Sequence, residues 1–189
     1  MSYFSPFYFL KNIMAITNWN LNASHSEVTF KVKHLVISTV SGQFKEFSAT
    51  ATTEGNDFST AKINFDINAA SLDTGKEMRD GHLRGNDFFN SESFPTIQFA
   101  STAVRKTGGD QYEIDGQLTI RDVTKAITLQ TEMGGIAVDL YGQTKAGFEV
   151  SGKIKRQEFG LTWNALTEAG GAVVSDEVKF MANVQFIKG

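Results

Sequence analysis

Side chains suited to acid–base chemistry and to anion binding are concentrated in residues 79–89 of this chain. Asp80 and His82 stand two residues apart, like half of a hydrolytic triad, and Arg79 and Arg84 add positive charge beside them. The pair would serve a cofactor-free hydrolase or isomerase if both side chains pointed into one pocket at hydrogen-bonding distance. The same residues also suit an exposed salt-bridge cluster or the mouth of a ligand site, so all three interpretations stand.

Other routes to catalysis have little support in the sequence. Ser26 and Ser71 are available nucleophiles, but neither lies in a G-x-S-x-G motif. The three histidines are dispersed and lack the H-E-x-x-H spacing of a zinc site. The chain has no cysteine, which excludes disulfides, thiolate ligands and thiol nucleophiles. We therefore predict no catalytic residue, no metal and no cofactor, and favour a carrier over an enzyme.

Length and charge narrow the class of protein further. A chain of 189 residues, 41% of them hydrophobic, suffices for one well-buried domain. The net charge is only −3, and lysines and arginines are scattered along the sequence. Neither nucleic acid nor an anionic membrane surface is therefore an expected partner. The oligomeric state is open, with a homodimer as one option.

Residues 1–16 differ in composition from the remainder, which we assign to one domain at residues 17–189. Their aromatic run is too short to span a bilayer, and it lacks the basic start and the cleavage site of a secretory signal. We expect translation to begin naturally at Met14 and the protein to be cytoplasmic. A degenerate signal or anchor, and with it a periplasmic location, is the alternative.

Apolar and polar residues alternate with period 2 through most of the chain, as in half-buried strands. Glycine-rich turns at 54–57, 107–110 and 133–135 separate these runs. Helix is expected only within residues 73–91, with Asp73 or Thr74 as the N-cap. The pattern predicts an all-β domain with one short helical excursion. A closed antiparallel barrel is favoured over a sandwich, because closure removes exposed strand edges.

The interior of such a barrel is either filled or hollow. Sixteen phenylalanines can fill it completely, which suits a protein-interaction module, or line a ligand cavity. Periodicity alone leaves these two options even. Glycines inside the strand patterns at Gly42, Gly116, Gly147 and Gly152 are positions where strands can bend.

Motifs spread over residues 19–187 resemble those of one family. They include Trp19 with His25-Ser26, Arg79-Asp80-Gly81-His82-Leu83, Asp87-Phe88-Phe89, Phe94-Pro95-x-Ile97-x-Phe99 and Arg156-x-x-Phe159-Gly160. In this order they resemble the YceI-like family, polyisoprenoid-binding proteins with a lipocalin-like barrel. Asn22, Asp122 and Lys155 depart from the residues usual in that family.

The resemblance implies that the barrel carries or sequesters an isoprenoid lipid, such as an isoprenoid quinone or a polyprenyl diphosphate. The polar head would lie near His34, Arg79 and His82. An apolar lumen gains roughly 0.8 kcal/mol per buried CH₂, so affinity needs no specific polar contact. Inward-facing residues of the strands would line the lumen: Phe30, Val32, Phe65, Ile67, Phe99, Leu118, Ile120, Phe148, Val150 and Phe180.

Overall fold

The computed structural model describes residues 15–166 and 173–189, and the described part is almost entirely β-sheet. The strands are β1 (Ile16–Leu21), β2 (Glu27–His34), β3 (Ser38–Phe44), β4 (Phe47–Glu54), β5 (Asp57–Asn68), β6 (Leu72–Asp73), β7 (Thr96–Gly108), β8 (Gln111–Ile120), β9 (Val123–Val138), β10 (Thr144–Lys155) and β11 (Val174–Lys188). Three 3₁₀ turns, η1 (Ala23–His25), η2 (Ala69–Ser71) and η3 (Arg156–Phe159), accompany one helix, α1 (Glu77–Arg84). The expected start at Met14 lies outside the described residues.

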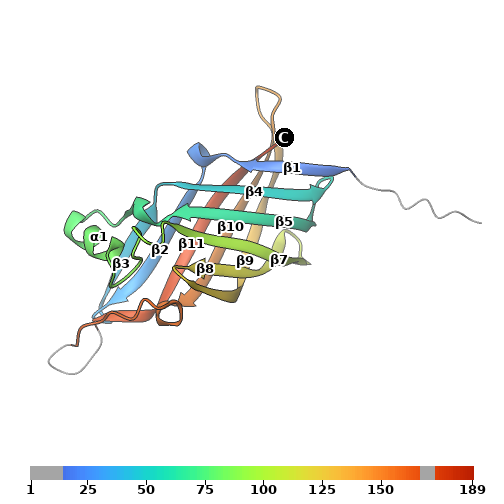
Figure 1. The fold of residues 1–189 in the computed structure, drawn as a ribbon. Helices are drawn as coiled ribbons and strands as arrows, with labels where there is room; N and C mark the ends of the chain where they lie inside the picture. The colour runs from blue at the N-terminus through green and yellow to red at the C-terminus, as the bar shows by residue number, and fades with distance from the viewer. Residues whose placement is uncertain (1–14, 167–172) are drawn as a thin grey trace, which may run out of the picture.

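Eight strands close into an antiparallel barrel, as predicted (Figure 1). Their order is β1-β4-β5-β7-β8-β9-β10-β11, and β11 pairs back onto β1. Trp19 shows the closure, because it lies opposite Ala51 of β4 on one side and Lys188 of β11 on the other. Closure pairs the strand edges that an open sheet would leave free.

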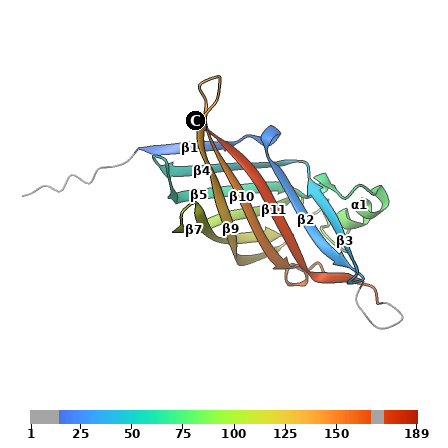
Figure 2. The same ribbon diagram turned by 180° about the vertical axis from the view of Figure 1, so that it is seen from behind.

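Strand β11 is long enough to serve two partners. Residues 186–188 pair with β1, whereas residues 174–183 pair with β2. The sheet then continues from β2 to β3 and to the short β6. Figures 1 and 2 show α1 at this end of the barrel, beside β3. The wall of the barrel is therefore closed by the pairing of β11 with β1 toward one end. Toward the other end, β11 pairs with β2 instead, and α1 lies there.

The helix lies within the predicted segment, but its predicted N-cap is wrong. The N-cap is Lys76, and its side chain makes no capping hydrogen bond. Gly75, with φ +75°, interrupts the chain between the expected caps and the helix. Asp73 instead accepts a hydrogen bond from the Gly75 amide, in a turn that precedes the helix. Among the described residues, no helix is both long and apolar enough to cross a bilayer.

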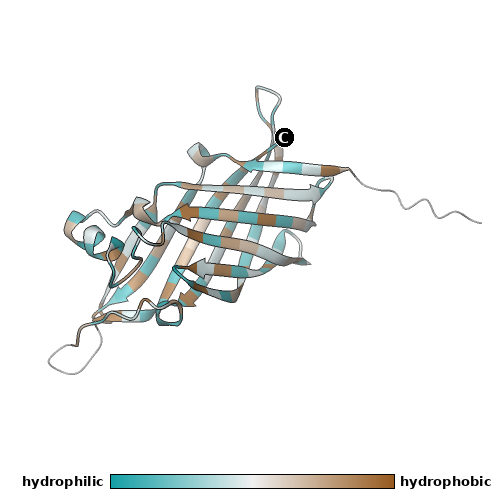
Figure 3. Cartoon of the chain, viewed as in Figure 1, coloured by the Kyte–Doolittle hydropathy of each residue, from teal (hydrophilic) through white to brown (hydrophobic). Residues whose placement is uncertain are grey.

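The period-2 pattern sorts the side chains into an inner and an outer face. Figure 3 shows the underlying alternation of hydrophobic and hydrophilic residues along the strands. On β2, Phe30 and Val32 line the interior, whereas Lys31 and Lys33 are exposed. On β11, Phe180 lines the interior and Lys179 is exposed. A slip of one residue would reverse every one of these positions, so the burial pattern fixes the register.

Three glycines let interior phenylalanine rings lie flat against the neighbouring strand. A Cβ built on each glycine would approach the ring within 2.4, 2.5 and 2.3 Å for the pairs Gly42 with Phe30, Gly152 with Phe180 and Gly116 with Phe99. These positions were predicted as bends. Their structural role is close ring packing, whereas Gly147 lies beside a register shift between β9 and β10.

Gly152→Ala is expected to lower the free energy of unfolding by about 1–3 kcal/mol, because overpacking forces a ring off its preferred position. The ring of Phe180 would have to move, and Leu129 also lies 3.0 Å from the new methyl group. Gly147→Ala in the same strand is the matched control, since nothing lies within 4 Å of its Cβ. Urea unfolding of both variants tests this, and equal losses would contradict the packing explanation.

Candidate ligand-binding cavity

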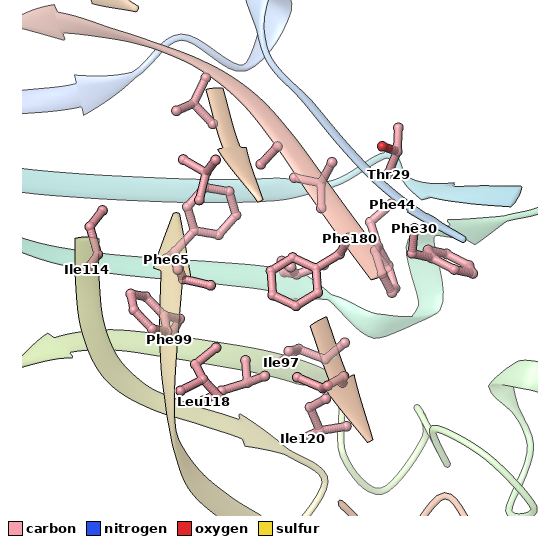
Figure 4. Close-up of a pocket in the computed structure, with 18 of the residues that line it drawn as sticks. Thr29, Phe30, Phe44, Phe65, Ile97, Phe99, Ile114, Leu118, Ile120 and Phe180 are labelled. Atoms are coloured by element: carbon pink, nitrogen blue, oxygen red, sulfur yellow. The ribbon is translucent and has the colours of Figure 1, made fainter. Parts of the chain in front are cut away.

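The barrel encloses a cavity of about 250 Å³ that runs along its interior (Figure 4). All ten residues predicted to line a lumen do line it, from Phe30 on β2 to Phe180 on β11. In Figure 4, Phe65, Phe99 and Phe180 project toward the middle from different strands. The barrel is therefore hollow, and the filled-barrel interpretation does not describe it. Whether these residues bind a ligand stays a prediction.

The cavity wall is apolar over nearly its whole length. Ten of the chain's sixteen phenylalanines contribute to it. Among the described residues that line it, Thr29 and Thr131 are the aliphatic alcohols and Arg156 is the one charged residue. An interior of this kind favours a hydrocarbon ligand, because polar groups would lose hydration without gaining partners.

Tightly packed residues close the cavity at the β1 end. Trp19 is fully buried, and its indole Nε1 donates a hydrogen bond of 2.9 Å to the hydroxyl of Thr53. The Trp19 ring packs at 5.0 Å from Phe58, which in turn lies 4.9 Å from Phe148. Phe58 and Phe148 line the cavity, so this cluster forms its floor.

The opposite end is covered by α1 and the residues that follow it. Leu83, Phe88 and Phe89 reach the cavity from this segment. Phe89 meets Phe44 of β3 edge-on at 5.9 Å between ring centroids. Phe88 is buried and Phe89 is partly buried, and both line the cavity, so they pack this loop onto the barrel. A ligand held in the cavity would contact these side chains.

Asp80 and Arg79 hold the start of the helix instead of facing the cavity. The buried Asp80 carboxylate accepts hydrogen bonds from the amide and the hydroxyl of Thr74. Arg79 donates from Nε to the Thr74 hydroxyl at 2.7 Å and from Nη2 to the Thr74 carbonyl at 2.9 Å. Because the Asp80 carboxylate is buried, it needs these hydrogen-bond partners, which gives Asp80 a structural role.

The geometry contradicts the Asp80–His82 catalytic pair. His82 bonds through Nε2 to Asp87 at 2.8 Å, whereas Asp80 bonds to Thr74. Residues two apart on a helix do not share a face, which separates these side chains. Neither residue belongs to the described lining of the cavity. The hydrolase or isomerase alternative therefore lacks the arrangement that it requires.

The predicted headgroup residues lie beside the cavity, not on its wall. The His82 ring packs edge-on at 5.1 Å from Phe88 and at 4.8 Å from Trp163. His34 lies opposite Val174 at the end of β2. Phe88 and Val174 both line the cavity, so His82 and His34 are one side chain removed from it. Arg79 is committed to Thr74 and has no comparable position.

Arg156 is the site residue that sequence reasoning missed. It is 4% exposed, and its guanidinium donates to four main-chain carbonyls. Burial lowers the pKa of Arg156, and Asp176 acts in the opposite direction. The guanidinium also lies 6.0 Å from the Phe88 ring centroid. The sequence offered Arg156 only as part of a family motif at 156–160, so a charge inside the wall was not expected.

Comparisons with known proteins agree with this architecture. The profile of the YceI-like domain matches residues 19–186. A UPF0312 protein of Staphylococcus epidermidis is 36% identical over 172 residues, covering 90% of this chain and 98% of that protein. The crystal structure of a Campylobacter jejuni YceI protein is 34% identical, with a TM-score of 0.71, covering 83% of this chain and 90% of that one.

A third similarity is more distant. A polyisoprenoid binding domain from Saccharophagus degradans superposes with a TM-score of 0.69 over 90% of this chain and 98% of that domain. Its sequence is 16% identical, so the likeness concerns the fold alone.

Proposed function

The chain belongs to the YceI-like domain family, and on that premise we propose that its barrel binds one isoprenoid lipid and carries or sequesters it. The observation that carries the proposal is the continuous, almost wholly apolar cavity inside the barrel. A distant structural neighbour is a polyisoprenoid binding domain, which adds support from a protein of the same fold. The cavity supplies what a branched hydrocarbon chain needs, a dry interior lined by rings and aliphatic side chains.

Burial of hydrocarbon supplies enough free energy for tight binding. Three isoprene units bring fifteen carbon atoms, which at ~0.8 kcal/mol each gain about 12 kcal/mol. Micromolar affinity corresponds to about 8 kcal/mol. About 4 kcal/mol then remains to offset the ordering of the chain and the loss of its free motion. The proposal therefore needs no strong polar contact.

The polar head of such a ligand would lie outside the apolar cavity, at the end near α1 and beside Phe88. There it would lie near His82, whose ring packs edge-to-face against Phe88, and near Arg156 on the cavity wall. His34 borders the same wall through Val174. Because Arg156 has already given its donors to four carbonyls, its contribution to a head would be mainly electrostatic. A quinone and a diphosphate head are both compatible with this arrangement.

Two experiments test the proposal. Mass spectrometry of an organic extract from the purified native protein should recover an isoprenoid lipid at about one per chain. Titration of ligand-free protein with a prenyl chain should give saturable binding at micromolar concentration or below. A straight-chain alcohol of equal carbon number is the control for nonspecific hydrophobic binding. Absence of saturable prenyl binding at micromolar concentration would remove the proposal.

A further inference from the structure

The β2–β3 hairpin ends in three exposed apolar residues. Leu35, Val36 and Ile37 are 38%, 82% and 86% exposed, although side chains of this kind are normally buried. Figures 1 and 2 show this hairpin tip at the end of the barrel opposite the β9–β10 tip. Val36 and Ile37 thus lie almost wholly outside the core, and Leu35 is only partly covered.

The tip also carries unfavourable backbone geometry. Leu35 has φ +51° and Val36 has φ +65°. Two successive positive φ values are typical of a type I′ turn, for which asparagine and glycine are strongly favoured. A β-branched residue in this region is a genuine outlier, and such strain is concentrated at functional positions. The sequence of the tip is therefore poorly explained by folding alone.

A row of lysines crosses the outer face of the barrel below this tip. Lys31 of β2 lies directly opposite Lys179 of β11, and Lys179 lies directly opposite Lys153 of β10. Like charges in directly opposed positions destabilise a sheet, so this row also calls for an explanation beyond folding. Glu177 offsets part of the charge, at 3.3 Å from Lys153 and 4.0 Å from Lys179.

Two further lysines extend this basic face. Lys33 and Lys155 are exposed on the same strands, one alternate position nearer the hairpin end. The expectation that basic residues are scattered is thus wrong in space. Residues far apart in the sequence are gathered by the pairing of β2, β11 and β10. We call the five lysines together the lysine face, defined as Lys31, Lys33, Lys153, Lys155 and Lys179.

Charge changes sign along the same three strands. Four residues farther from the tip, Glu27 of β2 and Glu149 of β10 lie opposite Asn183 of β11. Glu132 of the next strand, β9, lies opposite Glu149 and extends the acidic row. At ~3.3 Å per residue this acidic row lies about 13 Å from the lysine row. On this face, the lysine row therefore lies nearer the apolar tip than the acidic row does, with Glu177 among the lysines.

From these observations we propose that the apolar tip and the lysine face together dock the protein on an anionic lipid bilayer. The tip inserts its three side chains among the lipids, and the lysine face contacts the negatively charged headgroups. Lys31 is about 13 Å from Leu35 along the strand, at ~3.3 Å per residue, within reach of the headgroup layer once the tip is inserted.

A bilayer fits these features better than a protein partner does. The apolar surface is a projecting hairpin tip, and among the described residues Leu35, Val36 and Ile37 line neither the barrel cavity nor the pocket beside α1. The tip also adjoins the cavity wall, because the Leu35 amide donates to the Val173 carbonyl at 2.8 Å and Val174 lines the cavity. The proposal does not depend on which ligand the cavity holds.

Vesicle sedimentation with isoprenoid-free lipids tests the proposal on the full chain. Vesicles with about a third phosphatidylglycerol in phosphatidylcholine should bind the protein, and binding should fall as salt rises. Leu35→Asn with Val36→Gly should reduce binding at least tenfold. The same double variant should keep or raise the melting temperature, because asparagine and glycine suit the turn. A loss of vesicle binding without a loss of melting temperature would therefore report a loss of docking and not a loss of folding.

The opposite hairpin provides the matched control. Leu140 and Tyr141 at the β9–β10 tip are 101% and 91% exposed, but this tip lies away from the lysine face. Leu140→Ser with Tyr141→Ser should leave vesicle binding unchanged. Lys31→Gln, Lys153→Gln and Lys179→Gln together should reduce binding at least tenfold at low salt, since each lysine contributes about fivefold.

Three outcomes would overturn the proposal. The first is binding that is equal on vesicles of pure phosphatidylcholine. The second is an equal loss from changes at the two hairpin tips. The third is an absence of vesicle binding by the wild type, with the same tip variant instead weakening capture of an acidic protein, which would reassign the surface to a protein partner. Prenyl titration of the tip variant should give the wild-type affinity, so failure of docking is distinguishable from failure of the lipid-carrier proposal.

Discussion

Arg156→Met is expected to lower the free energy of unfolding by about 3–5 kcal/mol, one of the largest losses available from a single substitution in this barrel. The guanidinium donates to the carbonyls of Leu161, Trp163, Val174 and Ser175, at 2.5 to 3.2 Å. Methionine fills the space but leaves these acceptors without their donor. Removing the buried charge offsets part of this loss of stability, because the folded protein no longer has to desolvate a guanidinium. The same desolvation lowers the pKa of Arg156.

Two controls distinguish this network from a general effect of losing an arginine. Arg156→Lys keeps the charge but presents a single ammonium, which cannot match the planar fork of donors, so its loss should be intermediate. Arg105→Met removes a half-exposed arginine paired with Glu113 and Asp115, and the unfolding midpoint should scarcely move. Urea unfolding monitored by circular dichroism measures all three. A loss below about 1 kcal/mol for Arg156→Met would show that the carbonyls are satisfied without it.

Local periodicity was sufficient to predict the strands and which of their side chains face inward, whereas it left open whether the interior is filled or hollow. On β2 the alternation of Phe30 and Val32 with lysines places each side chain on the correct face, because the side-chain period of a strand is 2. The same rule found the wall residues on β5, β7, β8, β10 and β11. These positions depend on burial within one strand and require no knowledge of which strands are neighbours.

Features that depend on neighbouring strands or on helix geometry escaped the sequence. Lys31, Lys153 and Lys179 form one row only because β2, β11 and β10 are adjacent, and nothing in the sequence specifies that order. Asp80 and His82 look paired in the sequence, but their spacing on α1 sends them to Thr74 and Asp87. The role of Arg156 depends on carbonyls up to nineteen residues away.

Ala182→Phe is expected to weaken prenyl binding about a hundredfold while the barrel remains folded. Ala182 lines the cavity on β11, opposite Val150 on β10 and Val28 on β2. An added ring would occupy space that a bound chain needs, displacing about one isoprene unit. At ~0.8 kcal/mol per carbon this unit accounts for about 4 kcal/mol, of which about 2.8 corresponds to a hundredfold loss.

The neighbouring residue, Met181, supplies a control in which the same aromatic ring is added on the outer face of the barrel. Met181 precedes Ala182 on β11 and is 40% exposed, so Met181→Phe places the ring outside the barrel. Prenyl titration should give the wild-type affinity for this variant, and both variants should unfold cooperatively. The cavity gives Ala182→Phe room for its ring, so its stability should fall by no more than about 1–3 kcal/mol. If a folded Ala182→Phe bound the prenyl chain as tightly as Met181→Phe does, the chain would have to bind outside the cavity, because a ring within the lumen cannot share space with it.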